Sequence, residues 1–185
     1  RRLAPATEKL LAGWIDHFLE RYRQYADWVT HGEPPVMWLS GLHVPEAYLT
    51  ALVQTTCRAN GWPLDKSTLY TQVTQFVDPA EVESKPESGC YVRGLYLEGA
   101  SWDREAGALA PQEPKVLVTD LPILRIVPIE RHKLKLGGTF KTPVYVTQGR
   151  ANAMGEGLVF EADLGSEEHE SIWVLSGVSL CLNVA

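Results

Sequence analysis

Two stretches, PPVMWLSGL at residues 34–42 and GLYLEGASWD at residues 94–103, decide how the rest of the chain is interpreted. Each places a tryptophan near glycines of the kind found in tight turns. Neither contains a cluster of metal ligands, a nucleophile beside a base, or a lysine-bearing phosphate loop. We therefore interpret both as segments that serve packing, and the elements around them are predicted outward from there.

A long amphipathic helix is predicted upstream of the first stretch. Thr7, followed by Glu8, supplies a capping hydroxyl and then an acidic residue in the first turn. Apolar side chains then follow in alternating steps of four and three, and this stripe consists of Leu11, Ile15, Phe18, Tyr22, Tyr25 and Val29. A coiled-coil seam would need about three or four heptads. We therefore expect the helix to dock on its own domain or on a neighbour, and to end near Gly32.

The first stretch itself predicts a short strand over 36–39, closed by Ser40 and Gly41. Pro45 then occupies the first turn of a second predicted helix, 45–60, which Gly61 ends.

Beyond Trp62 the apolar period changes from helical to two, which is typical of strands. The expected strands cover 70–77, 90–97, 116–119, 123–129, 143–147, 158–164 and 173–182, with loops at 79–89, 105–114 and 151–157. Successive short strands without intervening helices favour an antiparallel sandwich or barrel. The predicted fold is α+β: a helical subdomain over 1–62, followed by an antiparallel β-barrel over 63–185.

The net charge and the cysteine content of the chain narrow the class of protein. The chain has 185 residues and a net charge of -6, which disfavours nucleic-acid and anionic-membrane partners because both need a concentrated basic face. Its three cysteines stand far apart in the sequence, so we expect reduced, buried thiols. The chain begins Arg-Arg-Leu without methionine, and we expect it to be a piece of a longer protein.

Patterns for catalysis, cofactors and metals are incomplete. Residues 94–101 have the glycine spacing of a phosphate-binding loop, but Ala100 stands where that loop needs its lysine. The five histidines show neither i, i+4 pairing nor partner cysteines, so no metal ligands are predicted. The second stretch is instead expected to be a structural turn, in which glycines free the backbone, a tryptophan packs on the core and an aspartate caps the turn: Gly94, Gly99, Trp102 and Asp103.

The order of motifs resembles the C-terminal region of a dynein heavy chain. The resemblance rests on LAGWIDHFLERYRQYADWV at 11–29, the first stretch and its following helix, YVRGLYLEGASWD at 91–103, FKTPVYVTQGR at 140–150 and IWVLSGVSLCLNV at 172–184. The resemblance covers nearly the whole sequence. Within the family, the sequence is similar to the axonemal or flagellar branch. One departure is Ser101, where the family pattern leads us to expect arginine.

The resemblance implies a non-catalytic domain that braces, and regulates, the AAA+ ring of an ATP-driven microtubule motor. ATP and magnesium would bind in the ring, and microtubules and other dynein subunits would be reached through the parent heavy chain in a cilium or flagellum. The expected interaction residues are Leu11, Phe18, Tyr22 and Trp38. The alternatives are a small-ligand β-barrel, an enzyme whose residues assemble only in three dimensions, and a docking module for a dynein accessory chain.

Overall fold

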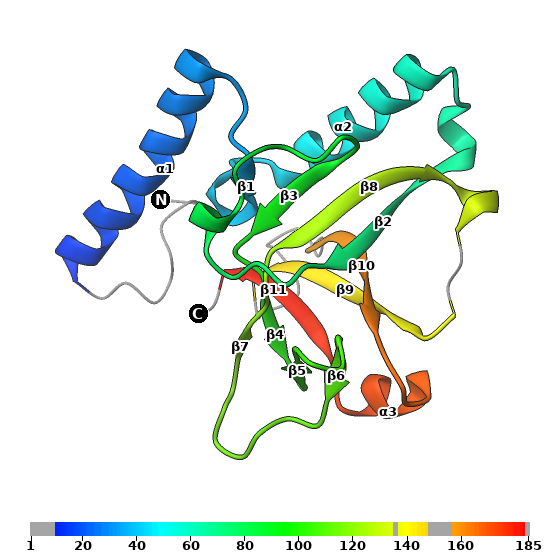
Figure 1. Ribbon diagram of the computed structural model, residues 1–185. Coiled ribbons are helices and arrows are strands. Elements are labelled where there is room, and N and C mark those ends of the chain that lie inside the picture. Colours follow the sequence, from blue (N-terminus) through cyan, green and yellow to red (C-terminus); the bar gives the residue numbers. More distant parts are fainter. Residues whose placement is uncertain (1–9, 135–136, 148–156, 184–185) are drawn as a thin grey trace.

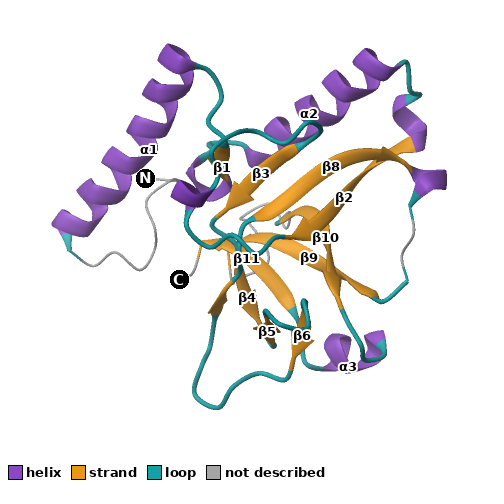
Figure 2. Cartoon of the chain, viewed as in Figure 1, coloured by secondary structure: helices purple, strands orange, loops and turns teal. Residues whose placement is uncertain are grey.

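The computed structural model describes residues 10–134, 137–147 and 157–183. Its helices are α1 (Leu11–His31), α2 (Pro45–Asn60) and α3 (Glu170–Leu175), with 3₁₀ turns such as η1 (Leu39–Gly41) between elements. The strands are β1 (Val36–Trp38), β2 (Ser67–Val73), β3 (Cys90–Arg93), β4 (Tyr96–Glu98), β5 (Ser101–Asp103), β6 (Ala108–Ala110), β7 (Thr119–Asp120), β8 (Leu124–Glu130), β9 (Thr139–Thr147), β10 (Leu158–Gly165) and β11 (Ser179–Asn183). Figure 2 shows the strands at the centre of the molecule and the helices around them.

The two long helices follow their sequence signals. Pro45 and Glu46 stand in the first turn of α2, and Gly61 ends it in the left-handed conformation, so the predicted span 45–60 is confirmed. The helix α1 runs to His31 and ends at Gly32, as expected. Its predicted start at Thr7 lies outside the described residues. No helix in the described ranges combines the length and apolar content needed to cross a membrane.

The strands form three sheets. One has the order β1-β3-β8-β2, the second β10-β9-β11-β4-β7, and β5 pairs with β6 in a hairpin. A mixed α+β fold is therefore confirmed, but no closed barrel is found among the described strands. The antiparallel pairing expected over 63–185 was wrong at one place, because β11 runs parallel to β9. The strand β1, which precedes this segment, also runs parallel to its partner β3. Such pairings join segments far apart in sequence, which local periodicity does not report.

Several local predictions differ from the structure. Residues 116–118, expected in a strand over 116–119, lie in no strand, and β7 covers only Thr119–Asp120. The single strand expected over 90–97 is divided into β3 and β4 at Gly94, where the backbone has a positive φ of 84°. The strand expected over 173–182 begins instead as the short helix α3, in which only Trp173 is buried, and β11 starts after the turn at Gly177. Part of the loop expected over 105–114 is the strand β6, and most of the loop expected over 151–157 lies outside the described residues.

The hydrophobic core crosses the boundary predicted at residue 62. One continuous cluster includes Met37, Leu39 and Leu49 from the first 62 residues together with side chains from both larger sheets. The strand β1, also from the first 62 residues, pairs with β3. Figure 1 shows α2 lying along the β1-β3-β8-β2 sheet, whereas α1 lies at one side of the molecule. The helical segment therefore shares its core and one sheet with the segment that follows it.

A buried polar contact joins the two larger sheets. Asp163 of β10 is 3% exposed, and its Oδ2 accepts a hydrogen bond from the backbone N–H of Thr71 in β2 at 3.4 Å. The Thr71 hydroxyl also bonds the main chain of Asp163, and the ammonium Nζ of Lys141 in β9 lies 3.4 Å from Asp163 Oδ1. This contact fixes how β2 and β10 meet within the core.

Candidate interaction surface

The apolar stripe of α1 faces away from the domain. Leu11, Phe18 and Tyr22 are 72%, 52% and 62% exposed, and Val29 is 89% exposed. In α1, which the structure describes in full, Arg21 alone is buried. An amphipathic helix normally turns its apolar side toward its own core, so α1 is oriented in the opposite way. The residues that would form a core in most helices are here available to a partner.

Polar side chains, together with Trp28 packed against the core, hold α1 to the domain. The Nε2 of Gln24 donates to the Trp38 carbonyl at 3.1 Å, and its Oε1 accepts from the Trp38 N–H at 2.8 Å. Nearby, Arg21 Nη2 donates to the carbonyl of Ser40 at 3.0 Å. Glu20 forms an ion pair with Arg93 at 2.7 Å. Hydrogen bonds have directional geometry, and this set fixes the rotation of α1 about its axis, with the stripe facing outward.

Trp38 is the centre of this attachment. Its side chain is 6% exposed, and the guanidinium carbons of Arg21 and Arg93 lie 5.8 and 5.3 Å from the centre of its indole ring. The His17 ring meets it edge-on, with ring centres 5.1 Å apart. Burial lowers the pKa of the Arg21 guanidinium from its ordinary value, and Tyr25 opposes this shift. The four interaction residues expected from the sequence therefore fall into two groups. Leu11, Phe18 and Tyr22 are exposed, whereas Trp38 packs within its own chain.

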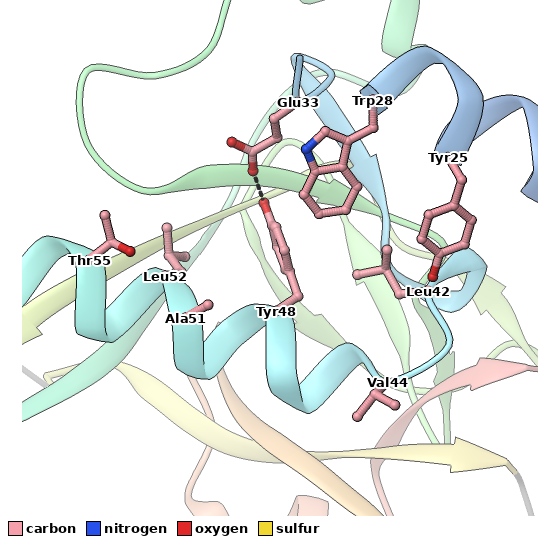
Figure 3. A pocket seen from close by; sticks show the side chains of 9 residues that line it. All are labelled: Tyr25, Trp28, Glu33, Leu42, Val44, Tyr48, Ala51, Leu52 and Thr55. Atoms are coloured by element: carbon pink, nitrogen blue, oxygen red, sulfur yellow. Dashed lines mark hydrogen bonds between the residues drawn. The ribbon is translucent and has the colours of Figure 1, made fainter. Parts of the chain in front are cut away.

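A groove continues the exposed surface between α1 and α2 (Figure 3). It has a volume of about 460 Å³ and opens to solvent. Aromatic and aliphatic side chains line most of it, and the lining residues are Tyr25, Trp28, Glu33, Leu42, Val44, Tyr48, Ala51, Leu52 and Thr55. Tyr25 belongs both to this groove and to the stripe, so the two features form one surface.

Hydrogen bonds and ring contacts hold the groove walls in place. The Tyr25 hydroxyl accepts the N–H of His43 at 2.8 Å, and Trp28 meets the Tyr48 ring edge-on. The Tyr48 hydroxyl makes a short hydrogen bond to Glu33, the contact drawn as a dashed line in Figure 3. Burial raises the pKa of the Tyr48 hydroxyl, and the neighbouring Cys90 and Glu33 raise it further. This hydroxyl therefore stays protonated and can donate to Glu33 at neutral pH.

The stretch 94–103 contains two glycines at close backbone contacts and one capped turn. A side chain at Gly94 would approach within 2.7 Å of the Trp38 ring, so glycine lets the two segments pack closely. Gly99 has a φ of 76° and lies against the main chain of Ser176. Trp102 is partly buried against the core, and Asp103 Oδ1 accepts the N–H groups of Glu105 and Ala106 at 2.9 and 3.0 Å in the turn between β5 and β6.

Two attachment residues, Arg21 and Gln24, were missed from the sequence. They stand three residues apart on α1, outside the apolar stripe. Their spacing is the only sequence signal, because three residues make almost one helical turn. Within the described ranges, no group of three or more histidine, cysteine or acidic side chains is arranged to hold a metal ion.

Comparison with known proteins identifies the family. Residues 1–182 match the profile described as the C-terminal domain of the dynein heavy chain. The chain belongs to this family. Over 183 residues, 99% of its length, it is 65% identical to the Dynein-1-alpha heavy chain of the flagellar inner arm I1 complex from Chlamydomonas reinhardtii and to human Dynein axonemal heavy chain 10. It is 39% identical over 185 residues to the Dynein beta chain of the flagellar outer arm from Chlamydomonas reinhardtii.

The dynein C-terminal domain is a small part of these relatives. The 185 residues span 4% of the length of each of the three heavy chains. Their names place them in axonemes or flagella.

Proposed function

We propose that this domain braces the AAA+ ring of an axonemal dynein heavy chain in a cilium or flagellum. The brace would dock through the outward stripe of α1, with Leu11, Phe18 and Tyr22 as its principal contacts. ATP hydrolysis with magnesium would take place in the ring, and microtubules and other dynein subunits would be bound elsewhere in the parent chain. Through this contact the domain would also regulate communication between the ring modules.

The observation that carries this proposal is the orientation of α1. Its large apolar side chains are exposed although polar contacts to Trp38, Ser40 and Arg93 hold the opposite side of the helix in place. Fully burying one large apolar side chain contributes roughly 1.5–3 kcal/mol, so several such residues together can support a stable contact. An exposed stripe of this kind marks an interaction site more often than a free surface.

Docking can be tested by co-elution of the 185-residue chain with a heavy-chain motor that ends immediately before it. The Phe18→Asp/Tyr22→Asp variant places two carboxylates in the stripe, where both native side chains are exposed and contribute little to the fold. Leu117→Asp is the matched control, because Leu117 is an exposed apolar residue, 81% accessible, far from α1 in sequence.

The proposal predicts that the native chain and Leu117→Asp co-elute with the motor, whereas Phe18→Asp/Tyr22→Asp does not. A folded Phe18→Asp/Tyr22→Asp variant that co-elutes as well as the native protein would contradict ring docking through α1. If the same variant kept the ring contact but lost an accessory dynein subunit, the stripe would instead be a docking module for that subunit.

A further inference from the structure

The exposed stripe of α1 repeats at an interval of seven residues. Leu11, Phe18 and Tyr25 occupy one set of positions, and Ile15, Tyr22 and Val29 occupy the other. These six positions, two per seven residues, form a line that we call the seam, and Trp14 and Leu19, each 37% exposed, widen the apolar face beside it. Such a seam fits side chains from a second helix that crosses it at a small angle, about 20°. The stripe is shorter than a coiled coil needs, but this spacing favours a single packed helix as the element that covers it.

The groove between α1 and α2 lies where this seam reaches the C-terminal half of α1. Tyr25 is at once a seam residue and a wall of the groove, while Val44 and Ala51 stand on its accessible side. The volume of about 460 Å³ lies in the range of sites that enclose a bound group. A helix that follows the seam would therefore carry one of its side chains over this groove.

The groove favours an uncharged side chain. Among the described residues that line it, Glu33 alone is charged, and both of its carboxylate oxygens have partners. One oxygen bonds the Tyr48 hydroxyl, and the other lies 2.9 Å from the ammonium of Lys85. A lysine or arginine that entered the groove would lose its hydration and find no unpaired carboxylate to form an ion pair with. An apolar side chain would instead contact apolar walls.

The walls are already ordered without a partner. The Tyr25 and Tyr48 hydroxyls are held by His43 and Glu33, and the Trp28 ring packs against Tyr48 (Figure 3). Preformed walls reduce the loss of side-chain freedom on binding, which otherwise opposes association. This pattern is that of a socket for one anchoring side chain.

We infer that the groove between α1 and α2 receives one large apolar side chain from an α-helix of the same heavy chain, a helix that packs along the stripe of α1. This inference rests on the proposed docking to the ring and names the element that makes the contact. The same heavy chain is favoured as its source because the three relatives compared extend far beyond this domain, which makes up 4% of each. The seam selects a helix, and the paired Glu33 selects an apolar anchor.

Photo-crosslinking in the intact heavy chain tests this inference. A photoreactive residue is introduced by Ala51→p-benzoylphenylalanine, at an exposed position of α2 that lines the groove. Ala59→p-benzoylphenylalanine is the matched control, because Ala59 is also exposed on α2 but does not line the groove. A third variant, Phe18→p-benzoylphenylalanine, reports stripe docking alone. We expect the probe at residue 51 to form an adduct with a large apolar residue in a helix elsewhere in the same heavy chain, and the probe at 59 to form none there.

A charge placed in the groove provides the second arm. With the photoreactive residue placed by Val44→p-benzoylphenylalanine, Ala51→Asp puts a carboxylate among the apolar walls and should lower the adduct yield by about ten-fold, whereas Ala59→Asp, outside the groove, should leave it unchanged. If the probe at 18 reaches the ring but the probe at 51 gives no adduct within the heavy chain, the groove inference is wrong and ring docking stands. If the probe at 18 also fails to reach the ring, the proposed function itself is wrong. An adduct between residue 51 and a separate subunit would overturn the assignment to the same heavy chain.

Discussion

Gln24 binds the main chain of Trp38 through both of its polar groups, donating to the carbonyl at 3.1 Å and accepting from the N–H at 2.8 Å. An amide side chain can satisfy a donor and an acceptor at once, and here it replaces a strand neighbour for the end of β1. The contact joins the middle of α1 to β1, the edge strand of the β1-β3-β8-β2 sheet. It thereby sets which side of α1 faces outward, and the apolar stripe becomes a surface as a result.

Changing this amide to a carboxylate should loosen α1. In Gln24→Glu, the oxygen that replaces Nε2 cannot donate to the Trp38 carbonyl and repels it. Leaving a buried polar group without its partner costs about 1–3 kcal/mol. We expect faster backbone amide exchange in α1 and a lower free energy of unfolding in urea, with α2 unchanged as an internal control. Unchanged exchange in α1 would show that its other contacts suffice to hold it.

The glycine at position 99 should be far less replaceable than the one at 107. Both have positive φ, 76° and 65°. A Cβ at Gly99 would lie 2.7 Å from the carbonyl oxygen of Ser176, whereas one at Gly107 would meet nothing within 4 Å. Gly99→Ala should therefore lower the free energy of unfolding by about 2–4 kcal/mol, and Gly107→Ala by about 1 kcal/mol. Equal losses in thermal or urea unfolding would exclude the contact with Ser176 as the cause of the difference.

The buried carboxylate of Asp163 should depend on the charge of Lys141. Lys141→Met removes the ammonium 3.4 Å from Asp163 Oδ1 and leaves a carboxylate that is 3% exposed. Because Lys141 is itself partly exposed, we expect a loss of about 1–3 kcal/mol in the free energy of unfolding. Adding Asp163→Asn to Lys141→Met should restore part of the lost free energy of unfolding, because the buried side chain is then uncharged. A double variant with the simple sum of both single losses would show that the two side chains are not coupled.

Alkaline pH should destabilise the domain in part through Cys90. Burial raises the pKa of its thiol from 9.0 to about 12, and the Tyr48 contact opposes this shift only partly. Between these values the unfolded chain has lost the thiol proton and the folded chain retains it, so stability falls as pH rises from about 9 to 12. The slope from this one group reaches about 1.4 kcal/mol per pH unit. Urea unfolding from pH 8 to 10.5 should therefore show a shallower decline for Cys90→Ala, and parallel declines would contradict the assignment.

The sequence predicted those elements whose signals are local. The helix 45–60 follows from Pro45 and Gly61, and the apolar stripe of α1 follows from its spacing. The segment 173–182 was mispredicted because the β-branched Val174 and Val178 favour a strand, although His169 caps a short helix by accepting the N–H of Ser171. Parallel pairing of β1 with β3, and of β11 with β9, depends on residues far apart in the sequence and has no local signal.

Only part of the candidate surface could be predicted from the sequence, for the same reason. The apolar stripe could be identified from spacing, but its direction depends on Gln24 meeting the backbone of Trp38, fourteen residues away. Trp38 itself was expected at the docking surface because large aromatics dominate interfaces. Its place beneath Arg21 and Arg93 requires β3, which lies more than fifty residues further along the sequence.

The most direct test of the central claim is the accessibility of position 18 in the intact heavy chain. Phe18→Cys and, as a control on the same helix, Arg23→Cys are labelled with a maleimide and followed by mass spectrometry of the α1 peptide. The three native cysteines of this domain are buried and should react slowly. The account predicts that labelling at residue 18 is slower by about ten-fold or more in the intact heavy chain than in the 185-residue chain, while residue 23 changes little. Equal labelling rates at residue 18 in the two proteins would show that the stripe of α1 stays exposed and that the domain does not dock through it.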